Sequence, residues 1–225
     1  MDQRRKLWNQ QQQTLRSALS SSAEHAKAIE LFLGQQAMVH ASAMSQSGLY
    51  SFDDELWDGL DDDAARRIPL KGEHSIAWML WHTARIEDMA LNVLVAGSRQ
   101  VFDDSGWGKR LNVPVRNTGN DMDAEAIARL SAEIDVEALK AYRLAVGRRT
   151  REIVSQLTPE ETRQKVEAYR LQQLKEDGSV LESAAWLLDY WGGLTKAGLL
   201  LMPPTRHNFV HLNEAQKVKH KVSKG

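Results

Sequence analysis

The stretch HSIAWMLWHTARIEDMALNVLVAG, residues 74–97, decides the fold class because its apolar residues recur with the period of an α-helix. On a helical wheel of about 100° per residue, six side chains lie within about 60° of His82: Ser75, Trp78, Met79, Ile86, Met89 and Val93. The charged pair Glu87 and Asp88 falls more than about 100° away. We therefore expect His82 in the middle of an apolar stripe that faces the core of a helical domain.

Helical patterns continue on both sides of this stretch. Long helices are predicted near residues 20–45, 75–97, 135–157 and 180–202, and no useful length of sequence alternates as a β-strand does. Pro203-Pro204 is expected to end the fourth of these helices, and Thr205 to cap a separate C-terminal helix. Residues 1–15 are polar and rich in glutamine, which is typical of a flexible tail.

These elements predict an all-α fold, a four-helix bundle of long antiparallel helices with extra short helices and a C-terminal helix. A chain of 225 residues fits a single domain over residues 1–225. The near balance of Lys+Arg 29 and Asp+Glu 30 predicts no nucleic-acid partner. The absence of cysteine excludes disulfides, thiolate nucleophiles and Cys-ligated zinc.

Two observations argue against a membrane or secretory segment. The start MDQRRKLWNQQQQ has no apolar stretch, and the most apolar segment, 180–202, contains Glu182, Asp189 and Lys196. We therefore expect a cytoplasmic protein that does not associate with membranes.

The histidines His207 and His211 form an H-x-x-x-H pair in TRHNFVHLNEA, residues 205–215. Residues four apart share one helix face, so the two imidazoles can ligate one metal ion together with His82 from another helix. Glu214 lies on the same face and suits a position beside the ligands. The alternative is that His82 is a hydrogen-bonded core residue, and that the pair belongs to a solvated face.

The residues Ile76-Ala77-Trp78-Met79-Leu80-Trp81-His82, followed by Ile86-Glu87-Asp88, resemble the histidine helix of the DinB-like (YfiT-like) superfamily. The resemblance implies a four-helix bundle, often dimeric, that holds a divalent metal ion through three histidines at one end. Members include enzymes that use bacillithiol or mycothiol and many proteins known only as candidate metal-dependent hydrolases.

The resemblance also implies site residues. His82 matches the first ligand, and His207 and His211 reproduce the spacing of the other two, with Glu214 where the family pattern has glutamine. The pair, however, follows Pro203-Pro204 and the expected fourth helix instead of lying within that helix. Either it folds back onto the bundle end, or this branch has lost or rebuilt its site, with Asp189, Trp191 and Lys196 at the vacant positions.

Two classes of function follow. The first is a metal-dependent enzyme that uses zinc, nickel or iron as a hydrolase or a thiol S-transferase on a small-molecule substrate or thiol. In it, Trp78, Trp81 and Trp191 would line an apolar pocket, and Asp189 would lie nearby. The second is a non-catalytic bundle that binds a small ligand or a protein partner, in which the histidines are structural. We expect a homodimer from the resemblance and from the many large apolar residues.

Overall fold

The computed structural model describes residues 2–70 and 72–222, so the first residue of the expected tail lies outside the described part. Within that part, the regular structure is helical, and an isolated antiparallel bridge joins Lys165 to Thr195. The prediction of an all-α fold is therefore confirmed. No helix in the described ranges combines the length and the apolar character that crossing a membrane requires.

The helices follow one another along the chain in this order: α1 (Gln3–Leu19), η1 (Ser22–Glu24), α2 (His25–Met38), η2 (Ser42–Met44), α3 (Phe52–Trp57), α4 (Asp62–Arg66), α5 (Ile76–Asp88), η3 (Met89–Val95), α6 (Val101–Asp104), α7 (Trp107–Arg110), α8 (Ala124–Glu133), α9 (Val136–Gln156), α10 (Pro159–Arg163), α11 (Ala168–Glu176), η4 (Glu182–Ala184), α12 (Trp186–Gly192), α13 (Lys196–Leu200), η5 (Met202–His207) and α14 (Asn208–Val222). The segments η3 and η5 are π-helical, so they continue the helices next to them with a wider turn.

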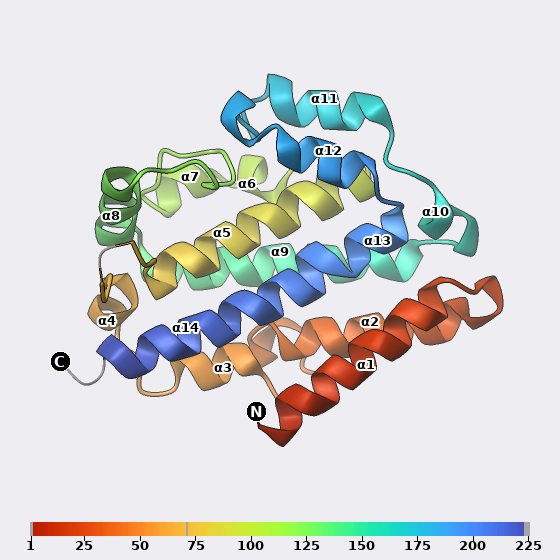
Figure 1. Cartoon of the computed structure of the whole chain (residues 1–225), viewed down its shortest axis with the longest axis horizontal. Coiled ribbons are helices and arrows are strands. Elements are labelled where there is room, and N and C mark those ends of the chain that lie inside the picture. Colours follow the sequence, from red (N-terminus) through yellow and green to blue (C-terminus); the bar gives the residue numbers. More distant parts are fainter. Residues whose placement is uncertain (1, 71, 223–225) are drawn as a thin grey trace.

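Four helices form the bundle, and α5 lies at its centre. Its neighbours are α9 and α14, while α2 packs on α9 and η5 from the far side (Figure 1). The expected antiparallel arrangement holds for α5 against α2 and α14, but α5 and α9 run in the same direction (Figure 1). A long crossover through α6, α7 and α8 makes this parallel pair possible.

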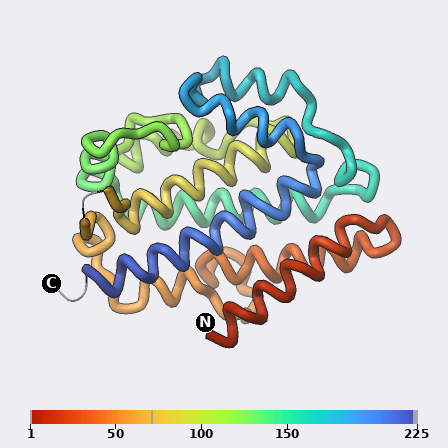
Figure 2. Tube along the Cα trace, viewed as in Figure 1, coloured from red at the N-terminus to blue at the C-terminus, as the bar shows by residue number. Residues whose placement is uncertain are grey.

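The fourth bundle helix differs from the prediction. The stretch 180–202 is broken between α12 and α13, where the Thr195 side chain caps α13 and the Lys196 amide donates to the Gln164 carbonyl. The helix that packs in the bundle is instead the continuous run α13–η5–α14, which Figure 2 shows as one track. The histidine pair therefore lies within the fourth bundle helix, near its middle.

Pro203 and Pro204 do not end this helix, contrary to the prediction. Proline removes an amide donor and so leaves a carbonyl of the preceding turn without its partner. Here Thr205 Oγ1 donates to the Leu200 carbonyl, which an amide at position 204 would otherwise reach, and Asn208 Nδ2 donates to the Pro203 carbonyl and holds the turn. Thr205 is thus part of the π-helical turn instead of an N-cap.

The expected flexible tail is wrong for the described residues, because residues 3–19 form α1. Glutamine is a good helix former, and Trp8, Gln12, Leu15 and Leu19 recur on one buried face. Trp8 stacks on Phe209 of α14 with ring centroids 3.9 Å apart. The helix therefore packs against α2 and α14, beside the four bundle helices.

Candidate metal centre

Three histidines from two bundle helices meet at one point. His82 comes from α5, His207 ends η5, and His211 begins the second turn of α14. One ligand nitrogen from each ring can be chosen so that all three lie within 4.8 Å of one another. The ring centroids are 5.0 Å apart for His82 and His207, 5.3 Å for His82 and His211, and 4.6 Å for the pair on the fourth helix.

The His82 ring is fixed from outside the bundle. Its Nδ1 lies 2.6 Å from the Thr118 carbonyl oxygen, in the loop after α7. A carbonyl only accepts, so Nδ1 carries the proton and Nε2 keeps its lone pair for a ligand. Trp78 stacks on the ring at 4.9 Å, and its own Nε1 donates to the Met122 sulfur at the end of the same loop.

The other two rings differ in their partners. A Glu214 carboxylate oxygen lies 2.8 Å from His211 Nδ1, within ion-pair distance although poorly aligned for a hydrogen bond. His207 Nδ1 is buried, and among the described residues it has no hydrogen-bond partner. A buried ring nitrogen without a partner is costly, and such atoms are a common sign of an ion or water that completes a site.

Burial keeps the three imidazoles neutral. Desolvation lowers the pKa of His82 to about 3, against the bond to the Thr118 carbonyl, which raises it. The pKa of His207 is held well below its usual range by burial and by the neighbouring His82 and His211 rings. Burial also lowers the pKa of His211, although Glu214 opposes the shift. Neutral imidazoles are the form that binds a metal ion, so no proton has to be displaced near pH 7.

The donor set fits a divalent transition metal. Nitrogen ligands bound at about 2.1 Å can be at most about 4.2 Å apart, so small side-chain rotations bring atoms now within 4.8 Å onto one ion. Three protein ligands leave a coordination position open, as in catalytic zinc sites. Imidazole ligands suit zinc, nickel and iron alike, and they do not select one of them.

The cluster lies at the floor of a cavity of about 600 Å³ between α5, α14 and the loop that carries Thr118. Trp78 and Asn120 line it, and charged side chains reach it from α14. His74 lies on the same wall, stacked on Trp78 with ring centroids 4.0 Å apart. The pKa of His74 is lowered by burial, so this imidazole is also neutral near pH 7.

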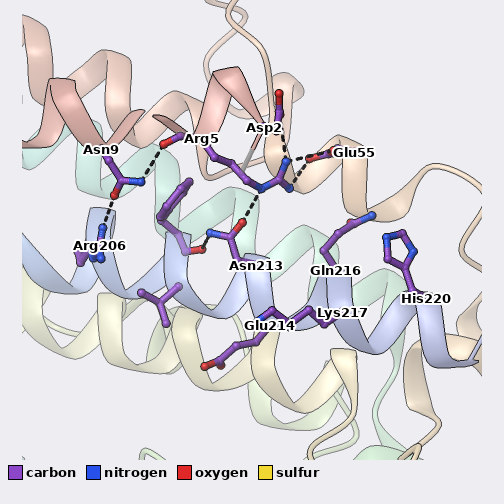
Figure 3. A pocket seen from close by; sticks show the side chains of 12 residues that line it. Asp2, Arg5, Asn9, Glu55, Arg206, Asn213, Glu214, Gln216, Lys217 and His220 are labelled. Carbon is purple, nitrogen blue, oxygen red and sulfur yellow. Dashed lines mark hydrogen bonds and ion pairs between the residues drawn. The ribbon is translucent and has the colours of Figure 1, made fainter. Parts of the chain in front are cut away.

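A second cavity, of about 690 Å³, lies across α14 from the histidines, between α1 and α3. Figure 3 shows why we do not place the chemistry there: Arg5 is engaged by Glu55 at 2.7 Å and by Asn213, so these polar groups satisfy one another. Glu214 borders both cavities, but its carboxylate extends away from the Arg5 group (Figure 3). The polar contacts that line this cavity join α1 to α3 and α14.

The structure places some of the remaining candidate residues at the site and others away from it. Trp78 lies in the site, whereas Trp81 lies behind it, against Gly119. Trp191 lines a smaller cavity that adjoins His82 and His207. Asp189 is exposed and lines neither cavity, and Lys196 is buried beside Gln164. Neither residue replaces a ligand, because the histidines themselves converge.

Sequence reasoning did not single out four other residues of the site: His74, Thr118, Asn120 and Met122. Three of them lie in the irregular stretch between α7 and α8, where periodicity carries no signal. The sequence does hint at this loop through Asn-Thr-Gly-Asn at 117–120, a combination that favours tight turns.

Comparison with known proteins agrees with the family and the fold. A sequence profile described as the DinB superfamily matches residues 54–191, a range that includes His82 and ends before the histidine pair. A crystal structure of a conserved protein from Enterococcus faecalis superposes with a TM-score of 0.61 and 14% sequence identity, covering 87% of this chain and 97% of that chain. At this identity the likeness concerns the fold alone. None of the curated proteins matches the chain.

Proposed function

The chain belongs to the DinB superfamily, and from this membership together with the histidine cluster we propose that it is a metal-dependent enzyme acting on a small molecule. The reaction is either a hydrolysis or the transfer of a low-molecular-weight thiol. A single observation carries the proposal: three neutral imidazoles converge at the floor of a cavity large enough for a small substrate.

Each residue has a definite task in this proposal. His82, His207 and His211 would hold the ion, which supplies a nucleophile at neutral pH by lowering the pKa of a water or a thiol. The Thr118 carbonyl fixes the tautomer of His82, so that the ring can bind only through Nε2. Glu214, three residues further along the same face of α14, lies beside His211 Nδ1 and leaves its Nε2 for the ion.

Two groups in the cavity can accept a proton. The Glu214 carboxylate borders the cavity and remains partly exposed. The His74 imidazole is neutral and faces the same space. A base within reach of the attacking group is what either a hydrolase or a thiol transferase needs.

Metal content of the untagged protein tests the proposal. We expect about one equivalent of zinc, nickel or iron per chain by mass spectrometry, with loss of most of it in the His82→Ala and His211→Ala variants. His220→Ala is the matched control, because this exposed histidine lies on the same helix outside the cluster. Equal metal binding by the wild type and both site variants would favour the alternative function, a non-catalytic bundle.

A substrate screen then separates the two reactions. A hydrolase should cleave activated esters or amides only when the metal is present, whereas a transferase should bind a thiol directly. With cobalt in place of the native metal, thiolate binding produces a charge-transfer absorption that water does not. Loss of either signal in His211→Ala, with His220→Ala unaffected, would tie the reaction to the cluster.

A further inference from the structure

A second, smaller chamber opens on the other side of the histidine cluster. Its volume is about 330 Å³, and it lies between α12, η5 and the central helix α5. His82, His207 and Asn120 border both this chamber and the larger cavity. The cluster therefore lies at the junction of two spaces, so a molecule bound at the metal position can extend into either of them.

The two spaces differ in charge. The charged residues Glu73, Lys217 and Lys221 line the cavity of about 600 Å³ at the histidines, together with Glu214. No Asp, Glu, Lys or Arg is among the described residues that line the smaller chamber, which is walled by Ile86, Trp186, Leu187, Tyr190, Trp191 and Met202. A charged group covered by this wall would lose part of its hydration without gaining a charged partner, so the lining favours uncharged groups.

The aromatic wall is only partly covered by the protein itself. Trp191 is buried, but Trp186 is 58% exposed and Tyr190 is 44% exposed. Both belong to α12, which presents them next to the cluster instead of turning them into the core. Exposed large aromatic residues that border a concave site are typical of ligand recognition, because their faces gain contact area when a ligand covers them.

We propose that this chamber binds an uncharged aromatic or branched-alkyl group of the substrate, with the reacting atom of the same molecule at the histidine cluster. A cavity of about 150 Å³ can hold benzene, so roughly twice that volume accommodates up to two fused rings. The polar remainder of the molecule would extend into the larger, charged cavity. The inference deepens the proposed function and rests on it, since it names the class of substrate.

Binding of simple probes to the metal-free protein tests this inference without any turnover. Benzyl alcohol is the neutral probe and benzylammonium its charged counterpart, both titrated in the presence of EDTA. The readout is the indole N–H resonances, which Trp→Phe variants assign. We expect benzyl alcohol to shift the signals of Trp186 and Trp191 at millimolar concentration, to leave that of Trp8 unchanged, and to bind at least 10-fold more tightly than benzylammonium.

Two variants make the test specific. Trp186→Ala should weaken benzyl alcohol binding about 5-fold or more, because it removes an exposed wall of the chamber without opening the core. Tyr169→Ala is the matched control, since Tyr169 is a 63% exposed aromatic residue of α11 that lines neither space. Equal binding by wild type and Trp186→Ala, or tighter binding of benzylammonium, would overturn the inference.

The outcome is separable from that of the metal proposal. If benzyl alcohol does not bind while zinc still does, the chamber is not a substrate subsite and the metal site stands. If benzyl alcohol binds while zinc does not, the subsite stands and the metal chemistry fails. A dimer in sedimentation that Trp186→Ala converts to monomers would show that a second copy covers the aromatic wall, and this too would overturn the inference.

Discussion

The Thr118 carbonyl and Gly119 determine how His82 is presented. Gly119 has a φ of 79°, and a Cβ at this position would lie 2.6 Å from Cζ3 of Trp81. Only glycine combines this backbone conformation with so close an approach to an indole ring. The neighbouring Thr118 carbonyl can therefore reach His82 Nδ1 only because residue 119 has no side chain.

The Gly119→Ala variant should lower zinc affinity by about 10-fold, because it displaces the carbonyl that orients His82. Competition with a chromophoric chelator measures this. The matched control is Gly59→Ala, which also has a positive φ of 67° but no neighbour near its Cβ position. Both substitutions strain the backbone, because alanine disfavours a positive φ. The difference in zinc affinity between the two variants therefore reports the contact with Trp81 alone. An equal zinc affinity in the two variants would contradict the positioning role of Thr118.

The protonation of His82 predicts a pH dependence of stability. Its pKa of about 3 in the folded state lies below the usual value of about 6.5, so the unfolded chain binds more protons as the pH falls. Stability is then complete above about pH 6.5 and is lost toward pH 3. For this residue alone we expect the free energy of unfolding to drop by roughly 2 kcal/mol between about pH 7 and pH 5.

Urea unfolding in EDTA over this pH range measures the slope. His207 and His211 should add to it, because burial lowers their pKa values as well. The His82→Gln variant cannot titrate at this position, so its stability should depend less on pH than that of the wild type. Parallel slopes for the two proteins would show that folding does not lower the pKa of His82.

At the scale of elements, the π-helical segment η5 is what brings the fourth helix into the site. Asn208 holds it: its Nδ2 donates to the Pro203 carbonyl at 3.0 Å and to Glu87 Oε2 at 2.8 Å. Glu87 in turn is fully buried on α5, where it also accepts from Thr150 and pairs with His40 at 3.0 Å. A polar contact therefore ties the helix of His82 to the turn that ends in His207.

The Asn208→Ala variant should destabilise the protein by about 2 kcal/mol, because it leaves a buried carboxylate and a carbonyl short of one donor each. It should also weaken zinc binding, since η5 loses its anchor to α5. Asn213→Ala is the control: it too removes an amide side chain of α14, with hydrogen bonds to Arg5 and to the Phe209 carbonyl, but none of these bonds reaches the π-helical turn or α5. Thermal unfolding and chelator competition measure both effects, and identical behaviour of the two variants would refute the anchoring role.

The sequence predicts these elements unevenly. The apolar stripe around His82 identified α5 and the place of its histidine, because a long periodic helix has a strong signal. Two features could not be predicted from the sequence. The helix continues through Pro203-Pro204 because side chains donate to the carbonyls of this turn. Glu87 is buried because α5 is enclosed on all sides. His40 is the partner of that buried carboxylate. Such tertiary compensation leaves no trace in the local pattern.

At the scale of the whole molecule, the site depends on how the two ends of the chain meet. His82 lies on the central helix, whereas His207 and His211 lie close to the C-terminal end of the described residues. The helix α1 secures this arrangement from the other end, through Trp8 against Phe209 and through Gln12 Nε2, which donates to the Leu201 carbonyl. Phe209 lies between the two ligand positions, so the packing of α1 and the geometry of the pair are coupled.

The Trp8→Ala variant tests this coupling. Removing a fully buried indole should cost about 3–5 kcal/mol of unfolding free energy, because the neighbouring helices cannot close the cavity. Leu7→Ala is the matched control, since Leu7 is the adjacent residue of α1 and is 49% exposed. Zinc binds only the folded chain. At about 100 times its Kd, zinc should therefore raise the free energy of unfolding by about 2.7 kcal/mol in a variant whose zinc affinity is unchanged. A smaller recovery in Trp8→Ala than in Leu7→Ala would show that α1 shapes the ligand pair as well as stabilising the bundle, whereas an equal recovery would limit α1 to stability.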